Sequence, residues 1–172
     1  MNMKNIEIRY IKKTDVKEMH QYVNILSQEK TYITLQGETI SLEDEERFVL
    51  SAIKKQKNKT GVTMVIVVDK VIAGICGINA KSSATEKHTA SLGISISKDF
   101  RGQKLGEKLL KKVIAESRKN IHGLKIITLG VYQGNFAIHL YEKLGFKVFG
   151  RLERGAKYRG KYIDRIEMAK HL

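Results

Sequence analysis

The sequence predicts an α/β (α+β) fold, with a single mixed central sheet of about seven strands flanked by about four helices. Two observations lead to this prediction. The first half of the chain is rich in β-strand patterns, and the second half follows the order strand, helix, strand, helix, strand. No Pro-, Gly- or Ser-rich stretch divides the 172 residues, of which 42% are hydrophobic. We therefore expect one domain over residues 1–172.

Alternation of apolar residues predicts a strand at the start of the chain. The alternating positions within residues 4–12 are Ile6, Ile8 and Tyr10. Thr14 and Asp15 follow as candidate helix caps. Residues 15–28 then carry apolar side chains at helical spacing, namely Val16, Met19, Tyr22, Val23 and Leu26. This segment is therefore expected to be the first helix.

A second helix is predicted after a polar loop over residues 30–40. Ser41 and Asp44 have the spacing of a capping box, so the helix begins after Ser41 and runs to about Lys57. Residues 61–78 then form two β-rich stretches joined at Asp69-Lys70, which predicts a hairpin. Residues 88–97 are expected to add a third antiparallel strand.

The pattern changes in the second half of the chain. From Gly106 one helical stripe contains Leu109, Leu110, Val113, Ile114 and Ser117. Residues 125–131 form a compact apolar strand, and residues 134–144 predict a short helix that ends at Gly145. The rest of the chain, 146–154 and 160–172, is expected to form a terminal pair of strands with its turn near Lys157–Gly160.

The formal net charge of +14 is unevenly distributed. Residues 1–97 contain 14 Lys and Arg against 11 Asp and Glu, whereas residues 98–172 contain 18 against 7. A polyanionic ligand is therefore expected at the C-terminal half, although charged helix faces that keep a Lys-rich protein in solution explain the same numbers. The charge disfavours capture of free polycations such as polyamines, unless a local acidic pocket overrides it.

Composition also limits the cellular setting and the cofactors. Cys76 is the single cysteine, which excludes an intramolecular disulfide, and the N-terminal residues show no secretory signal, so we expect a cytoplasmic protein. No apolar stretch is long enough to span a bilayer, so no membrane partner is expected. The five histidines lack metal-ligand spacing, so no metal is expected. Cys76 lies mid-strand between Ile75 and Ile78, which favours a buried inert thiol.

The turn at residues 101–106 has the features of an anion site. A strand ends there, the sequence Arg-Gly-Gln-Lys-Leu-Gly turns the chain, and a long amphipathic helix begins. Glycines permit close approach of the backbone, and the N–H groups and positive dipole end of a helix favour phosphate. The sequence contains neither the P-loop motif nor the dinucleotide-binding glycine motif.

This turn and a segment about thirty residues further on together resemble the GCN5-related N-acetyltransferase (GNAT) superfamily. Arg101–Gly106 matches the pyrophosphate-binding Arg/Gln-x-x-Gly-x-Gly/Ala segment, with Lys104 where the family usually has glycine. The Asn-x-x-Ala-x-x-x-Tyr-x-x-x-Gly-Phe segment is matched in part by Asn135, Ala137, Tyr141, Gly145 and Phe146, with Ala137 one residue early. The ending resembles the subset that includes ribosomal-protein, polyamine and small-amine acetyltransferases, through Gly150, Tyr158, Gly160, Tyr162, Asp164 and Met168.

Lys104 admits three interpretations at this stage. Its side chain is tolerated at a negative φ, it narrows the approach of the backbone to the pyrophosphate, or its ammonium group binds a phosphate oxygen.

The resemblance implies that the protein moves an acetyl group from acetyl-CoA, its co-substrate, to a primary amine by direct attack in a ternary complex. The acceptor class would be a peptide N-terminus, an amino-acid-like compound or another small amine, between walls formed by residues 30–40 and 157–160. Acetyl-CoA would lie in a V-shaped opening between strands 91–97 and 125–131. The implied cofactor-binding residues are Ile94, Ser95, Ile96, Arg101, Gly102, Gln103, Lys104, Leu105, Gly106 and Asn135. Tyr141 is the implied catalytic acid, since a phenol keeps its proton at pH 7.

The general base is open at the sequence level. Family members often have a glutamate on the strand before the pyrophosphate loop, but residues 89–93 contain no carboxylate. His88 acting through water and Glu38 from the substrate loop are the candidates, and free amine taken from solvent makes a strong base unnecessary.

Two other functions compete with the acetyltransferase. A basic nucleic-acid- or ribosome-binding module fits the positive second half, but no aromatic RNA-binding signature or recognition-helix pattern supports a nucleic-acid partner. A non-catalytic CoA-binding protein would retain the fold without turnover. A homodimer is a further possibility.

Overall fold

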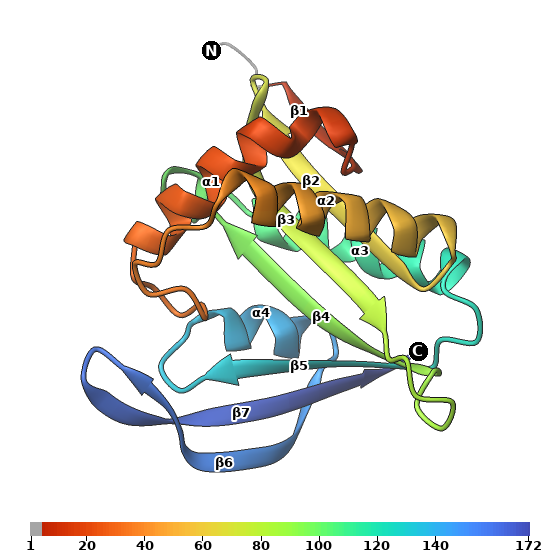
Figure 1. The fold of residues 1–172 in the computed structure, drawn as a ribbon. Helices are drawn as coiled ribbons and strands as arrows, with labels where there is room; N and C mark the ends of the chain where they lie inside the picture. The colour runs from red at the N-terminus through yellow and green to blue at the C-terminus, as the bar shows by residue number, and fades with distance from the viewer. Residues whose placement is uncertain (1–4) are drawn as a thin grey trace.

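The computed structural model describes residues 5–172, and it forms one mixed seven-stranded sheet flanked by four α-helices, as the sequence predicts (Figure 1). The strands are β1 Ile6–Tyr10, β2 Gly61–Val68, β3 Val71–Ala80, β4 Thr89–Ile96, β5 Ile126–Tyr132, β6 Lys147–Tyr158 and β7 Lys161–His171. The α-helices are α1 Val16–Gln28, α2 Leu42–Lys57, α3 Leu105–Asn120 and α4 Ala137–Lys143. The strand order is β1-β2-β3-β4-β5-β7-β6, and within residues 5–172 the one parallel pair is β4 and β5.

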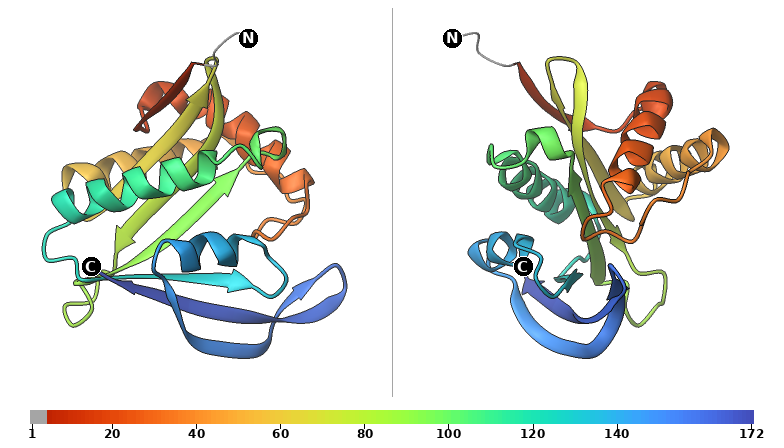
Figure 2. Two further views of the ribbon diagram at one scale, coloured as in Figure 1. Left: turned by 180° about the vertical axis from the view of Figure 1, so that it is seen from behind. Right: turned by 90° about the vertical axis from the view of Figure 1, so that its left-hand side faces the viewer.

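Helices lie on both faces of the sheet, as Figure 2 shows. The helices α1 and α2 pack on one face of β2 and β3, where Tyr22, Val49 and Val65 belong to one buried cluster. On the opposite face, α3 and α4 bury Leu109, Tyr141 and other side chains against the even-numbered positions of β4, among them Ile94 and Ile96. Residues alternate between the faces of a strand, so the odd-numbered positions of β4 face the side that carries α1 and α2.

The predicted cap of α2 and the predicted β2–β3 turn are confirmed, whereas Thr14 lies inside a short 3-10 helix, Lys13–Asp15, and caps no helix. Ser41 caps α2 by accepting a hydrogen bond from the Asp44 N–H, and Asp69 and Lys70 form the β2–β3 turn with φ of 49° and 70°. Asp15, by contrast, makes no side-chain cap on α1, because its carboxylate accepts hydrogen bonds from the Lys12 N–H and from Arg9. Sequence spacing suggests a cap at such a position but does not reveal an arginine on the neighbouring strand.

Element boundaries also shift in two places. The predicted strand 4–12 is shorter, Ile6–Tyr10, and Lys4 lies outside the described residues. The helix predicted for 134–144 begins only at Ala137, because the Asn135 side chain accepts a hydrogen bond from the Ala137 N–H and holds the preceding residues in a turn. Among residues 5–172 no helix has the length and apolar character needed to cross a membrane.

The parallel pair β4–β5 is joined at one end only. Thr89, Ala90 and Ser91 pair with Ile126, Ile127 and Thr128, and the pairing stops there. β4 continues for five residues paired only with β3, while β5 continues paired with β7. The two strands therefore diverge toward their carboxyl ends, and each has an unpaired edge there.

Candidate active site at the diverging strands

The family resemblance assigns three residues of β4, Ile94, Ser95 and Ile96, to cofactor binding. The free edge of β4 exposes backbone groups of Ile94 and Ile96. The Ser97 N–H donates to the Ala73 carbonyl on β3. Since backbone groups alternate in direction along a strand, the N–H and carbonyl of Ser95 are also directed to β3, and those of Ile94 and Ile96 to the free edge. The Ser95 side chain instead faces α1, where its Oγ lies 2.9 Å from the Tyr22 hydroxyl.

The predicted turn follows β4 and leads directly into α3. Gly102 has φ +75°, and a Cβ placed on it would meet no atom within 4 Å. Gly106 lies in the first turn of α3, where a Cβ would be 3.5 Å from Ile96 and 3.8 Å from Leu140 of α4. The start of α3, the end of β4 and α4 therefore meet at one place. The first N–H groups of α3 have no partner within the helix and are available to an anion.

Lys104 occupies the N-cap of α3 with a left-handed backbone, φ +59°. The interpretation that its side chain is tolerated at a negative φ is therefore wrong. A side chain in this conformation costs about 1–2 kcal/mol relative to glycine, because Cβ approaches the following carbonyl. That cost is the physical reason why glycine suits this position.

Arg101 and Gln103 hold the turn through their side chains. The Arg101 Nε donates to the Ile96 carbonyl at 2.9 Å, and its guanidinium pairs with the Glu29 carboxylate at the end of α1. Glu29 also accepts a hydrogen bond from the Lys98 N–H at 3.1 Å. Gln103 donates to the Asp99 carbonyl at 3.0 Å. The positive charge of Arg101 is thus partly balanced by Glu29.

Asn135 and Tyr141 lie on the other side of the opening. Asn135 follows β5 and uses its side-chain oxygen to start α4, 3.0 Å from the Ala137 N–H. Tyr141 is buried in α4, with its ring edge-on to Phe146 at 6.0 Å between centroids. Burial is the main reason why the pKa of Tyr141 is raised to about 12, and the nearby Cys76 raises it further. Its hydroxyl therefore holds its proton at neutral pH, as a general acid requires.

Of the two base candidates from the sequence, His88 lies at the joined end of the β4–β5 pair and Glu38 is hydrogen-bonded within its own loop. His88 precedes the joined end of the β4–β5 pair, where its carbonyl accepts from Lys125 and Ile126. Glu38 lies in the loop after α1 and accepts a hydrogen bond from the Gln36 N–H. That bond is the main reason why the pKa of Glu38 is lowered, and a lowered pKa makes a carboxylate a weaker base.

A carboxylate that the sequence did not single out lies closer to the opening. Ile166 and Met168 of β7 pack on the α3 side, so Arg165 and Glu167 project from the opposite face. Glu167 pairs across the sheet with Gly130 of β5, just past the point where β4 and β5 separate. It is partly exposed and ion-paired to the Arg165 Nε at 2.6 Å. Strand alternation predicts its face, but only the pairing register places it there.

The two predicted acceptor walls meet in the structure. Tyr32 from the loop after α1 stacks on Tyr158 at the end of β6, with ring centroids 4.6 Å apart. The Tyr158 hydroxyl donates to the Lys30 carbonyl at 3.1 Å. A cavity of about 540 Å³ lies between these walls. The stacking pair was not predicted, because the sequence does not show which aromatic residues of two distant segments meet.

Comparisons with known proteins agree with the fold. A model of the acetyltransferase (GNAT) family matches residues 20–146. An acetyltransferase of the GNAT family from Streptococcus pneumoniae superposes with a TM-score of 0.88 at 30% identity, covering 98% of this chain and 99% of the other. A protein named yncA from Salmonella typhimurium, solved with its cofactor acetyl-CoA, gives a TM-score of 0.84 at 21% identity over 98% and 94% of the two chains.

One curated protein is similar over a shorter stretch. The L-amino acid N-acyltransferase MnaT of Escherichia coli is 32% identical over 80 residues. This match covers 45% of the present chain and 45% of the relative, so the chain spans less than half of that protein's length.

Proposed function

The chain belongs to the acetyltransferase (GNAT) family, and from that premise we propose that it transfers an acetyl group from acetyl-CoA to a primary amine in a ternary complex. The observation that carries the proposal is the divergence of β4 and β5 directly beside the turn at 101–106. The space around Gly102, where a Cβ would meet no atom within 4 Å, fits close approach of a pyrophosphate.

The proposed binding roles follow from this arrangement. The backbone of Ile94 and Ile96 pairs with the pantetheine arm and supplies an N–H to the oxygen of the reacting carbonyl. The backbone of residues 101–106, with Lys104 and Arg101 as accessory charges, holds the pyrophosphate, and Asn135 binds the pantetheine side. The backbone of Ser95 is directed to β3, so the expectation that it also pairs with pantetheine is not carried into this proposal; its side chain joins β4 to α1 through the Tyr22 hydroxyl.

The proposed chemistry needs one acid and one base. Acetyl-CoA supplies a thioester carbonyl that an amine nitrogen attacks directly. Glu167 takes one proton from the ammonium form of the acceptor, and the C–N bond forms as the C–S bond breaks. Tyr141 gives its proton to the departing sulfur, and the second proton that the nitrogen loses on becoming an amide restores the Tyr141 hydroxyl. Glu167 is favoured over His88 and Glu38 because it alone of the three lies on the open face beside Gly130.

The acceptor, setting and assembly are proposed at a coarser level. The acceptor is a primary amine such as a peptide N-terminus or an amino-acid-like compound, and the E. coli relative is an L-amino acid N-acyltransferase. We propose that residues 1–172 act as one domain in the cytoplasm, where the free and buried Cys76 stays reduced. Light scattering at working concentration tests whether the chain is a monomer or a homodimer.

Thermal unfolding with acetyl-CoA tests the binding step of this proposal. A free ligand concentration one hundred times the Kd stabilises a protein by about 2.7 kcal/mol. ATP at equal concentration is the control, because a chain of net charge +14 attracts polyanions without a specific site. No stabilisation by millimolar acetyl-CoA would favour the nucleic-acid-binding alternative.

Release of CoA thiol over a panel of amines tests the transfer step. We expect release only when acetyl-CoA and an acceptor are both present. Stabilisation by acetyl-CoA without thiol release from any peptide or small amine would instead favour a non-catalytic CoA-binding protein.

A further inference from the structure

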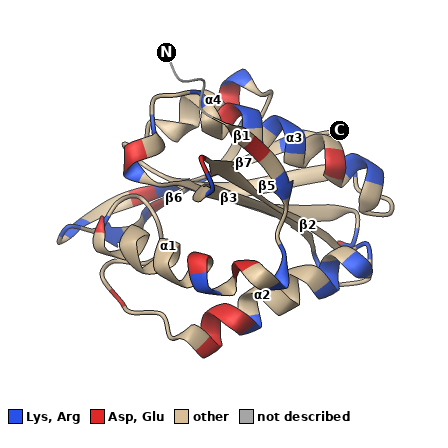
Figure 3. Ribbon diagram, turned by 90° about the horizontal axis from the view of Figure 1, so that it is seen from above, with Lys and Arg blue, Asp and Glu red and all other residues tan. Residues whose placement is uncertain are grey.

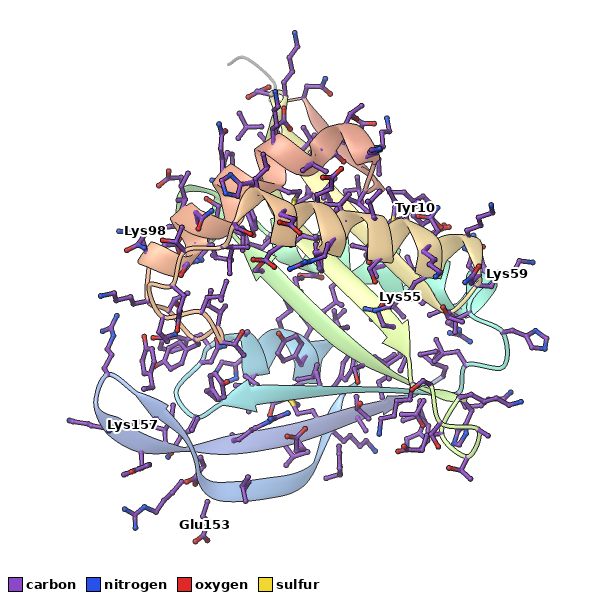
Figure 4. The ribbon with its side chains drawn as sticks, in the orientation of Figure 1. Tyr10, Lys55, Lys59, Lys98, Glu153 and Lys157 are labelled. Carbon is purple, nitrogen blue, oxygen red and sulfur yellow. The ribbon has the colours of Figure 1, made fainter. Side chains whose placement is uncertain are left out.

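The cavity between the acceptor walls is lined by cations from both sides. Lys30 comes from the loop after α1, Lys157 from the end of β6 and Arg159 from the β6–β7 turn, with Gln28 and Gln36 in the polar lining. Figure 4 labels Lys157 near the tip of this hairpin, next to the loop. Among the described residues, no ion pair involves Lys30, Lys157 or Arg159. Their charge is therefore available to a ligand.

The carboxylate in the lining, Glu29, is already engaged. It pairs with the Arg101 guanidinium and accepts a hydrogen bond from the Lys98 N–H. The three cations consequently dominate the potential in the cavity. Figure 3 shows that acidic and basic residues elsewhere are often neighbours, as at the start of α2, where Arg47 pairs with Glu43 and Asp44.

Aromatic contacts hold the Lys30 backbone and the Arg159 guanidinium beside the cavity. The Tyr32–Tyr158 stack joins the two walls, and the Tyr158 hydroxyl binds the Lys30 carbonyl. The Arg159 guanidinium lies over the Tyr158 ring, 5.1 Å from its centroid. Lys30 and Arg159 also have positive φ, 46° and 48°, so each lies at a tight turn of the backbone. The side chains of Lys30, Lys157 and Arg159 are all exposed, so an anion at the cavity can reach each of them, and Arg159 is the one already held by the Tyr158 ring.

We propose that this cavity selects amine acceptors that carry an anionic group, with a carboxylate or phosphonate bound by Arg159, Lys157 and Lys30. The proposal rests on the acetyltransferase function and goes beyond it by naming the acceptor's charge. Guanidinium groups bind such oxyanions through paired hydrogen bonds, and the ammonium groups add compact charge. The same surface would repel acceptors with a second amine, because nothing in the lining other than the engaged Glu29 is acidic.

Matched acceptors test the proposal. The series is an amine with a terminal carboxylate, its phosphonate analogue, its uncharged primary amide and the corresponding diamine, all of one chain length. We expect kcat/KM to be at least tenfold higher for the two anions than for the amide, and lowest for the diamine. Equal values for carboxylate, phosphonate and amide would overturn the proposal while leaving the acetyltransferase function intact.

Variants of the hairpin tip locate the effect. Arg159→Ala should reduce the preference for anion over amide at least fivefold through KM, and Arg159→Glu should reverse it. Lys161→Ala is the control, because it removes one positive charge from the same hairpin outside the cavity lining. An equal loss of the preference for the anionic acceptor in the Lys161→Ala variant would show that general surface charge causes this preference, and it would overturn the proposal.

The KM for acetyl-CoA separates the acceptor from the co-substrate. It should stay within about twofold of the parent value in Arg159→Ala, measured with the amide acceptor. A rise in that KM equal to the loss of anion preference would assign the cavity to the phosphates of acetyl-CoA and overturn the proposal. If no amine at all is turned over, the proposed function falls, and this inference falls with it.

Discussion

Lys104 holds a left-handed backbone at the start of α3, where its Cβ is strained. Replacing it with glycine removes a penalty of about 1–2 kcal/mol but adds freedom to the unfolded chain, so Lys104→Gly should raise the free energy of unfolding by about 0.5–1 kcal/mol. Urea unfolding measures this change. Lys108→Gly, four residues on in regular helix, should instead lower it by about 1 kcal/mol.

The same variant bears on the phosphate site. If backbone N–H groups hold the pyrophosphate, Lys104→Gly should change the acetyl-CoA affinity by no more than about tenfold, or roughly 1.4 kcal/mol. Calorimetry with acetyl-CoA measures it. A thousandfold loss would make the Lys104 ammonium a principal phosphate ligand.

Tyr141 should matter for rate more than for folding. Tyr141→Phe keeps the ring that packs against Phe146 but removes the proposed proton donor, so kcat should fall by roughly 10²–10⁴ with acetyl-CoA affinity unchanged. The pKa of Tyr141, about 12, also means that its ionisation should not reduce activity up to about pH 10. Rapid-quench measurement of the acetyl-transfer step avoids interference from slow product release.

A matched tyrosine serves as the control. Burial and the hydrogen bond to Glu116 likewise raise the pKa of Tyr10 to about 12, but Tyr10 lies on β1 at the far end of the sheet. Tyr10→Phe should leave the transfer rate unchanged. A lower melting temperature with a normal rate per folded molecule in Tyr141→Phe would make Tyr141 a packing residue.

Glu167 is the residue whose removal should alter the pH profile. Glu167→Gln is expected to lower kcat/KM by roughly 10²–10⁴ at pH 7. The difference from the parent should shrink as pH rises, because more of the acceptor amine is then already deprotonated. Glu153→Gln is the control, since Glu153 is an exposed residue on β6 (Figure 4). A constant ratio between variant and parent across pH 6–10 would remove Glu167 from the proton path.

At the scale of elements, the β4–α3 turn should depend on the absence of a side chain at Gly102. Gly102 and Gly123 have nearly equal φ, +75° and +70°, and a Cβ on either meets no protein atom within 4 Å. The strain caused by alanine should therefore be similar at both. Only Gly102→Ala should weaken acetyl-CoA binding, by about tenfold or more in calorimetry, because only that glycine lies in the proposed pyrophosphate turn. Equal affinities for the two variants would contradict the assignment.

This turn also shows what local sequence can predict. Residues 101–106 join a strand pattern to a helical stripe, and both signals lie within a few positions of the glycines. Three features of the site join distant residues instead: Tyr22 with Ser95, Glu29 with Arg101, and Glu167 with Gly130. Each depends on how whole elements pack, so no spacing along the chain indicates it. Glu167, the proposed general base, could not be predicted for that reason.

At the scale of the whole molecule, the order of strands and helices was predictable because hydrophobic periodicity switches clearly between two and 3.6 residues. The sequence predicted α1 and α2 as separate helices, but not that they pack together as a layer on one face of the sheet. Its attachment to the edge strand β1 depends on Arg9 and Asp15, whose atoms lie 2.7 Å and 2.9 Å apart in two hydrogen bonds. Asp15 is almost completely buried at this junction.

That ion pair should make global stability depend on acid pH. Burial alone would raise the pKa of Asp15, but the hydrogen bonds from Arg9 and the Lys12 N–H outweigh it and hold the pKa below the ordinary 3.8. A lowered folded-state pKa gives stabilisation that is present above the unfolded pKa and is lost as pH falls through the folded one. Asp15→Asn should therefore cost about 2–3 kcal/mol at pH 7, less than the 3–5 kcal/mol of a fully enclosed pair, since Arg9 is partly exposed. Urea unfolding between pH 7 and pH 2 measures the difference in free energy of unfolding between the parent and the Asp15→Asn variant. This difference should narrow only below about pH 4. A difference that is the same at every pH would mean that packing, and not the charge of Asp15, holds β1 against α1.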